Sequence, residues 1–395
     1  MAHRFDEVID RSASNADKYV LRERLFGTVD LLPMWVADMD IATPPFVVEA
    51  VKQRAEHPVY GYEEMPDSAF EAQMGWMERR HSLSLEREWL FYSPSVVASI
   101  SAAIEAFTRP GQKVVVQTPV YPPFFKRVEE SGRRLLLNPL KRLGSGDYSF
   151  DLEGLAAAID KDTKLLLLCS PHNPVGRVWR REELEALAAI CLERGVRVFA
   201  DEIHADLVYA PHRHIPFASL SDEVRAITLS AFGPGKTFNL AGLATSTLAI
   251  ADETMRDAFK QVHERIHFGP GSIFGHAAFE AAYRQGDGWL DDLLGHLEGN
   301  AALLKALCDR HGIGIRPPEG TYLAWMDCSN LGLSDPEMSR FFIAEAKLGL
   351  SPGILFGREG AGFMRLNFAV PTPIMSEALE RLERALPGRF QSSRA

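Results

Sequence analysis

Short apolar segments alternate with helical segments between residues 89 and 250, and this alternation constrains the fold more than any other feature of the sequence. It predicts a mostly parallel sheet with helices on both faces. Polar or proline-rich clusters follow these segments, at the strand ends where such sheets bind ligands. The predicted strands are 90–92, 113–117, 134–138, 165–170, 196–200, 226–230 and 244–250.

After residue 250 the pattern changes. Long helices are predicted over 255–284 and 288–309, followed by a mixture of short strands and helices after Gly312. This mixture indicates a second, smaller α+β domain. The predicted division is an N-terminal arm that also forms part of the small domain (1–45), a large domain (46–287) and a small C-terminal domain (288–395).

Composition excludes several classes of protein. Hydrophobic residues make up 46% and charged residues 24% of the 395 residues, which is typical of a globular protein. The net charge is −10 without a basic block, so neither nucleic acid nor an anionic membrane is expected as a partner. The N-terminus does not resemble a signal peptide, and apolar runs such as 165–169 are too short to span a bilayer, so we expect a cytoplasmic protein.

The four cysteines lack the spacing of metal ligands, and no metal site is expected. Three of them lie in or beside apolar runs, which favours reduced thiols in the core.

Lys236 lies in a turn of small residues, SAFGPGKTFNLAG (230–242), directly after an apolar segment. Gly233, Pro234 and Gly235 end the strand, and glycine allows the backbone to approach a ligand closely. A lysine held there can form a Schiff base with a carbonyl group. An isolated lysine is more often a solvated loop residue, so this hypothesis depends on the rest of the site.

Other strand ends supply matching groups. Asp201 closes an apolar strand, where a buried carboxylate needs a partner such as a pyridinium nitrogen. Asn173 can donate a hydrogen bond to a phenolate oxygen, and Tyr121 offers a flat face to a ring. Ser95 begins a helix whose N–H groups suit phosphate, and Arg365 between apolar residues suits a carboxylate.

Taken singly, each of these residues has an ordinary structural explanation. Asp201 could cap a helix, Tyr121 could belong to the core, and Arg365 could form an ion pair. Their order along the chain and their shared sheet edge favour a cofactor site instead.

The sequence resembles the fold-type I pyridoxal phosphate enzymes of the class I/II aminotransferase superfamily, and most closely their MalY/PatB group of cystathionine β-lyase-like carbon–sulfur lyases. The resemblance implies a pyridoxal 5'-phosphate cofactor bound by the large domain. The stretches that carry it extend over nearly the whole chain: LPMWVADMD (32–40), GY (61–62), PVYPPF (119–124), CSPHNPVGRVW (169–179), DEIH (201–204), KTFNLAGL (236–243), PEGTYLAW (318–325) and RLNFA (365–369).

The resemblance implies a role for each residue around the cofactor ring. Lys236 is the Schiff-base lysine and the catalytic base, and Asp201 pairs with the pyridine nitrogen. Asn173 hydrogen-bonds the ring hydroxyl, His204 lies near that side in a positioning or packing role, and Tyr121 stacks on the ring.

The resemblance also assigns the phosphate. Backbone N–H groups of Val96 and Val97 bind it, and Tyr62 reaches the phosphate of the neighbouring subunit's cofactor, which implies a homodimer. Arg365 binds the α-carboxylate of an amino-acid substrate, while Trp35 and Asp38 lie on an arm that helps to close the site.

The chain departs from the family's usual pattern around the phosphate. Gly233 and Gly235 stand where hydroxyl side chains are usual, and Ala244 replaces the phosphate-binding arginine of the aminotransferases. Ser95 brings a hydroxyl to the helix start instead. The hypothesis is that phosphate anchoring has moved toward Ser95 and the backbone N–H groups.

The expected reaction is β-elimination from cystathionine or another L-cysteine S-conjugate, giving a thiol, pyruvate and ammonia. The alternatives are an aminotransferase, a secondary-metabolism enzyme with other Cα chemistry on a cysteine S-conjugate, and a non-enzymatic regulator that binds a transcription factor. The residue at 244 favours the lyase over the aminotransferase, and the intact Lys236, Asp201, Asn173 and Arg365 argue against a regulator.

Overall fold

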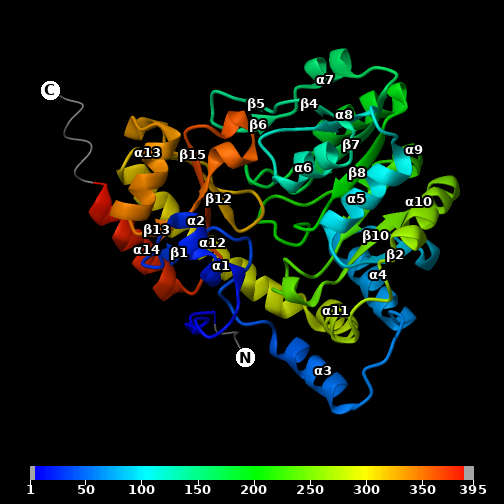
Figure 1. Ribbon diagram of the computed structural model, residues 1–395, viewed down its shortest axis with the longest axis horizontal. Coiled ribbons are helices and arrows are strands. Elements are labelled where there is room, and N and C mark those ends of the chain that lie inside the picture. Colours follow the sequence, from blue (N-terminus) through cyan, green and yellow to red (C-terminus); the bar gives the residue numbers. More distant parts are fainter. Residues whose placement is uncertain (1–4, 387–395) are drawn as a thin grey trace.

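The structure, a computed structural model, describes residues 5–386 and contains a seven-stranded sheet at its centre (Figure 1). Five adjacent strands are parallel, and β10 runs antiparallel to both of its neighbours, so the mostly parallel sheet predicted from the sequence is confirmed. In spatial order the strands are β2 (Leu90–Ser93), β10 (Ser246–Ile250), β9 (Thr228–Phe232), β8 (Arg197–Asp201), β7 (Thr163–Cys169), β3 (Lys113–Val116) and β4 (Arg134–Leu137).

Both faces of this sheet are buried, as β7 illustrates. Leu165 and Leu167 pack into one core with helices of one layer, whereas Leu166 and Leu168 pack into a second core on the opposite face. Because successive side chains of a strand point to opposite faces, burial on both sides requires the uninterrupted apolar run seen in the sequence. The first core includes α5 (Val96–Phe107), α6 (Pro123–Glu130) and α10 (Glu253–Ile266), and the second includes α7 (Leu152–Ala158), α8 (Arg181–Arg194) and α9 (Asp222–Ala226).

A second sheet of four antiparallel strands is formed by the C-terminal part of the chain. Its order is β11 (Gly314–Ile315), β12 (Leu323–Asp327), β15 (Phe363–Asn367) and β14 (Ser351–Pro352). Nearby, β1 (Leu32–Pro33) of the N-terminal arm pairs in parallel with β13 (Leu348–Gly349). The domain division at residues 45 and 287 stays a prediction, and its outermost residues, 1–4 and 387–395, lie outside the described part.

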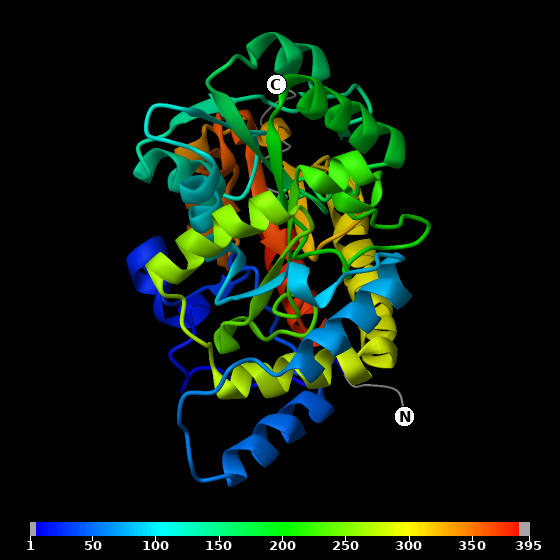
Figure 2. The same cartoon turned by 90° about the vertical axis from the view of Figure 1, so that its right-hand side faces the viewer.

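The helices α3 (Pro45–Glu56), α4 (Asp67–His81), α11 (Ile273–Gln285) and α12 (Asp287–Arg310) pack in a core that also includes residues of both sheets. In Figure 2, α3 lies beside α11, against which α4 also packs. The long α12 then contacts α14 (Thr372–Ala385) and β11. The shorter elements are α1 (Asp17–Val20), α2 (Arg22–Phe26), α13 (Asp335–Arg340), β5 (Lys141–Arg142) and β6 (Tyr148–Ser149).

The single helix predicted over 255–284 is wrong, because α10 ends at Ile266 and α11 begins at Ile273. His267, Gly269 and Gly271 all have positive φ angles, of 51°, 71° and 94°, which end a right-handed helix. Gly271 is also required for space, since a Cβ there would lie 2.5 Å from Cζ of Tyr92.

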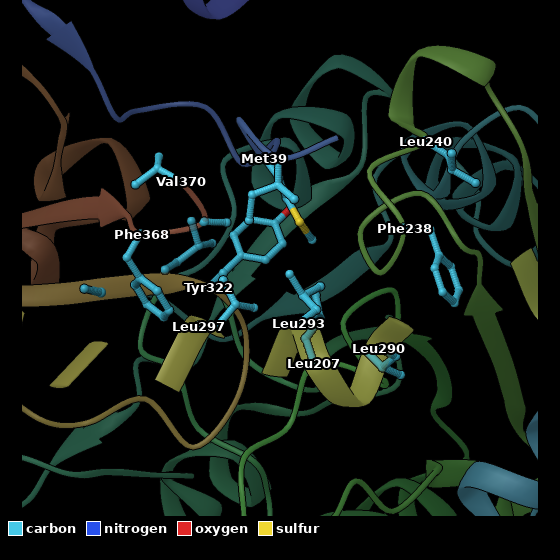
Figure 3. Packing of buried hydrophobic residues seen from close by; sticks show 14 of the residues in the cluster. Met39, Leu207, Phe238, Leu240, Leu290, Leu293, Leu297, Tyr322, Phe368 and Val370 are labelled. Atoms are coloured by element: carbon cyan, nitrogen blue, oxygen red, sulfur yellow. The ribbon is translucent and has the colours of Figure 1, made fainter. Parts of the chain in front are cut away.

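A third core joins the arm to the second sheet. Figure 3 shows Tyr322 at its centre, with Met39 of the arm, Leu207, Leu293 of α12 and Phe368 around it. All five side chains are buried, so the arm is part of the packed structure rather than a loose extension.

Three further findings concern the described residues. None of their helices is long and apolar enough to cross a membrane. Residues 5–386 also contain no group of three or more His, Cys, Asp or Glu side chains arranged to hold a metal ion. All four cysteines are buried and free, as expected for core thiols.

Candidate active site

The carboxyl ends of the central strands open into one cavity of about 350 Å³, to which the second sheet contributes Arg365 of β15. Trp35 of the arm also lines this cavity. Two of the predicted site residues, Asp38 and Tyr62, do not line it. The predicted residues that do line it are Trp35, Ser95, Val96, Val97, Tyr121, Asn173, Asp201, His204, Lys236 and Arg365.

Lys236 is half-buried and lines this cavity, and its Nζ donates a hydrogen bond of 2.6 Å to the backbone oxygen of Ala37. Burial, with the nearby positive charge of Arg365, lowers the pKa of Lys236 to about 8. The carboxylates of Asp38 and Asp201 oppose this shift. Because the pKa lies so close to neutrality, the amine can both accept and release a proton near neutral pH.

Asp201 ends β8, where Ile203 N donates a 3.2 Å hydrogen bond to its carboxylate. Burial raises the pKa of Asp201 to about 7, although the Ile203 hydrogen bond and the charge of Lys236 act in the opposite direction. A buried carboxylate of this kind is stabilised by a cationic partner in the cavity. A protonated pyridine nitrogen meets that requirement.

Asn173 and Tyr121 lie on adjacent strand-end loops that are joined by a hydrogen bond from Tyr121 N to Asn173 O, of 3.2 Å. The side-chain oxygen of Asn173 accepts a 2.9 Å hydrogen bond from Arg365 Nη1. Its amide nitrogen is therefore the group that it can offer to a phenolate oxygen. Burial raises the pKa of Tyr121, and the charge of Asp201 adds to the effect, so this side chain stays a neutral phenol.

Ser95 caps α5, because its Oγ accepts a 3.1 Å hydrogen bond from Ala98 N. Val96 and Val97 form the first turn, whose backbone N–H groups have no acceptor within the helix. Together with the helix dipole, these groups favour an anion such as phosphate at this end of the cavity.

Arg365 is buried, and its Nη2 donates a 2.8 Å hydrogen bond to the backbone oxygen of Trp35. Its guanidinium carbon lies 4.7 Å from the ring centre of Phe356. Among the described residues, Arg365 Nε has no hydrogen-bond partner. Burial lowers the pKa of Arg365 to about 10, so the group keeps its charge and suits a carboxylate ligand.

The two histidines near the site are neutral. Burial lowers the pKa of His204 and that of His172 to about 3. His204 lines the cavity and packs 6.0 Å from the ring of Tyr322, centre to centre, while His172 packs against Trp179 outside the cavity lining. Neither the position nor the charge of these histidines suits a catalytic base, and this favours the positioning or packing role expected for His204.

Two asparagines that the sequence did not mark as functional hold the arm over the cavity. Asn239, in the lysine turn, bonds the backbone of Met39 in both directions, at 3.1 and 3.0 Å. Asn367, on β15, donates to the backbone oxygens of Val36 and Asp38, both at 2.6 Å. Asn239 lies in the motif 236–243 and Asn367 in the motif 365–369. The motifs do not show that these side chains bond to backbone atoms far away in the sequence.

The side chain of Asp38 points into an ionic cluster of the arm rather than into the cavity. It lies 3.0 Å from Lys18 Nζ and 2.9 Å from Arg11 Nη2, and Asp40 pairs with the same two cations. Tyr62 is 99% exposed in this single chain. Its predicted contact with a neighbouring subunit stays a prediction.

A buried network supports the lysine turn from behind. Asp206 accepts hydrogen bonds from Trp76 Nε1 at 2.8 Å and from Thr237 Oγ1 at 2.8 Å, and His81 Nε2 lies 2.7 Å from the same carboxylate. Because Thr237 directly follows Lys236, this network fixes the backbone that carries the lysine.

Comparisons with known proteins agree with this geometry. Residues 30–382 match the family of class I and II aminotransferases. The chain is 41% identical to cystathionine β-lyase PatB of Bacillus subtilis over 97% of this chain and 99% of PatB, and 33% identical to MalY of Escherichia coli over 99% of both. Cystalysin of Treponema denticola, whose structure contains pyridoxal 5'-phosphate, matches with a TM-score of 0.95 at 32% identity, over 98% of this chain and all of cystalysin. The chain therefore belongs to the class I and II aminotransferase family, in which it groups with the PatB/MalY-type cystathionine β-lyases and C–S lyases.

Proposed function

We propose that this chain, a pyridoxal-phosphate-dependent C–S lyase of the cystathionine β-lyase-like group, cleaves the Cβ–S bond of L-cystathionine or another L-cysteine S-conjugate. The products are a thiol, pyruvate and ammonia. The identity to PatB over nearly the full length supports the reaction class. The structural observation that carries the proposal is Lys236, whose amine has a pKa of about 8 and lies in the same cavity as Arg365 and Asp201.

The residues of the cavity fit pyridoxal phosphate. The volume of about 350 Å³ is sufficient for a small cofactor with part of a substrate. Asp201 would hold the pyridine nitrogen, Asn173 the ring oxygen, and Tyr121 one ring face. The first turn of α5 would bind the phosphate, and Lys236 would hold the aldehyde carbon. When bound, the cofactor supplies an acceptor for the electron pair released at Cα.

The chain's own residues would orient the substrate and move its protons. Arg365 binds the α-carboxylate, and its hydrogen bond to Asn173 fixes the direction of the guanidinium. The substrate amine takes the place of Lys236, whose freed amine then takes the proton from Cα. The Cβ–S electron pair leaves with sulfur. The thiolate takes up a proton, and 2-aminoacrylate reacts with water to give pyruvate and ammonia. The arm, held by Asn239 and Asn367, limits access of solvent to Lys236.

A product assay tests the proposal against transamination. The purified enzyme with pyridoxal phosphate is incubated with L-cystathionine and a panel of S-substituted cysteines, and pyruvate and free thiol are measured. We expect both products in equal amounts. Formation of glutamate from 2-oxoglutarate, without pyruvate, would identify an aminotransferase instead.

We also propose that the active form is a homodimer in the cytoplasm. The exposed aromatic residues Tyr60 and Tyr62 on an extended loop support the dimer, since such side chains are typical of an interface. Light scattering should give the mass of two chains. Tyr62→Ala should weaken cofactor binding while leaving the mass unchanged, and a monomeric, fully active enzyme would contradict the proposal.

A further inference from the structure

Thr245 places a buried hydroxyl in the active-site cavity. The residue is 6% exposed, directly precedes β10 and lines the same cavity as Ser95, Val96 and Val97. The next residue, Ser246, pairs with Ser93, two residues before Ser95. Its Oγ1 has no hydrogen-bond partner within residues 5–386. Since a buried hydroxyl without a partner is unfavourable, this atom indicates a ligand that the protein itself does not supply.

Of the neighbouring hydroxyls, Ser246 Oγ already donates its proton, to the backbone oxygen of Ser93 at 3.0 Å. Ser95 Oγ accepts from Ala98 N and keeps its own O–H for a ligand. Thr245 is the second hydroxyl of this cavity that can donate to a ligand, and it has no bond within the described chain.

The backbone around Thr245 is fixed. The oxygen of Ala244 accepts a 2.8 Å hydrogen bond from the hydroxyl of Tyr92. On the other side, α11 approaches so closely that a Cβ on Gly275 would lie 2.6 Å from the oxygen of Leu243 and 3.6 Å from Cβ of Thr245. A side chain held between two rigid elements loses little freedom when it binds a ligand.

The charge expected at this place is negative. Val96 and Val97, in the first turn of α5, line the same cavity as Thr245, and the N-terminal end of the helix dipole favours an anion there. The lysine turn contributes no hydroxyl here, because Gly233 and Gly235 carry no side chain. Thr245 thus supplies the donor that the turn lacks.

We infer that Thr245 donates its hydroxyl proton to the phosphate of the cofactor and so selects the phosphorylated form of pyridoxal. The ligand group is a phosphate monoester dianion, which accepts several charge-assisted hydrogen bonds. This role depends on the cofactor and not on the sulfur substituent, so a different substrate would leave it intact.

The test compares two ligands on the full chain after removal of the cofactor, with circular dichroism to verify the fold. Dissociation constants for pyridoxal phosphate and for pyridoxal, which lacks the phosphate, are measured by absorbance for wild type, Thr245→Val and Thr245→Ser. Ser230→Ala is the matched control, because it removes a buried hydroxyl that also has no partner within the described chain but lies outside the cavity.

Thr245→Val should weaken binding of pyridoxal phosphate about tenfold or more and change binding of pyridoxal less than about twofold. Thr245→Ser should stay within about threefold of wild type for both ligands. Equal losses for the two ligands, an unchanged constant for pyridoxal phosphate in Thr245→Val, or the same loss in Ser230→Ala would each overturn the inference. None of these results depends on which products the enzyme forms, so they are separable from a failure of the proposed reaction.

Discussion

Adding a hydroxyl to the lysine turn should strengthen cofactor binding at one glycine and damage the fold at the other. A Cβ at Gly235 would have Ala241 Cα, 3.8 Å away, as its nearest neighbour, which is ordinary contact. A Cβ at Gly233 would lie 3.0 Å from Cβ of Ser246, 3.1 Å from its Cα and 3.2 Å from Cδ1 of Ile203. Serine therefore fits at residue 235, whereas at residue 233 it would push β9 away from β10.

The two substitutions are expected to change different quantities, the affinity for the cofactor at residue 235 and the stability of the fold at residue 233. A new hydrogen bond to a charged phosphate contributes about 1.5 kcal/mol, so Gly235→Ser should lower the dissociation constant of pyridoxal phosphate roughly tenfold. Overpacking at Gly233 should cost about 1–3 kcal/mol, which lowers the melting temperature by several degrees.

Titration with pyridoxal phosphate and thermal unfolding measure these two effects separately. Gly235→Ser should raise affinity without lowering the melting temperature, and it should restore much of the affinity lost in Thr245→Val. Gly233→Ser should melt earlier than wild type. An unchanged affinity for Gly235→Ser in both backgrounds would refute the placement of the phosphate, and an unaltered melting temperature for Gly233→Ser would refute the packing argument.

Three other predictions follow from the buried charges. Burial raises the pKa of Asp201 from 3.8 to about 7, so the folded, cofactor-free protein binds more protons than the unfolded chain between these values and loses stability as the pH rises through them. Asp201→Asn should therefore reduce the fall in melting temperature between about pH 5 and about pH 7. Lys18→Met removes the buried cation from Asp38 and Asp40, although Arg11 still pairs with both, and should cost about 1.5–3 kcal/mol in chemical unfolding. Arg365→Lys keeps the charge but loses planar recognition of a carboxylate, and should raise KM for L-cystathionine about tenfold or more with a smaller change in kcat.

Exposed residues provide controls for these variants. Lys52→Met on α3 and Asp257→Asn on α10 alter the same residue types at the surface and should leave stability within about 0.5 kcal/mol. A pH dependence of Asp201→Asn identical to that of wild type would contradict the assigned titration. A Lys18→Met protein as stable as Lys52→Met would show that the arm does not depend on its ion pairs, and an unchanged KM for Arg365→Lys would place the substrate carboxylate elsewhere.

The sequence was most informative where side chains and periodicity determine the result. The strands of the central sheet, and the placement of Lys236, Asp201 and Asn173 at its carboxyl edge, follow from apolar runs ended by turn residues. The predicted helix over 255–284 failed because hydrophobic periodicity continues on both sides of a break that depends on the backbone conformation at 267–271. The position of Thr245 could not be predicted either, since one threonine before a strand has no distinguishing pattern.

The arm was the least predictable part of the site, because its role rests on main-chain atoms. Consecutive backbone oxygens from Trp35 to Asp38 accept hydrogen bonds from Arg365 and Asn367 of β15 and from Lys236 in the turn after β9. The bonds depend on position along the chain and not on the identity of the arm residues. Deletion of one residue in this segment would place the backbone oxygen of Val36 or Asp38, instead of the backbone oxygen of Ala37, next to the amine of Lys236. The number of residues in the arm is therefore as much a determinant of the active site as the lysine that it covers.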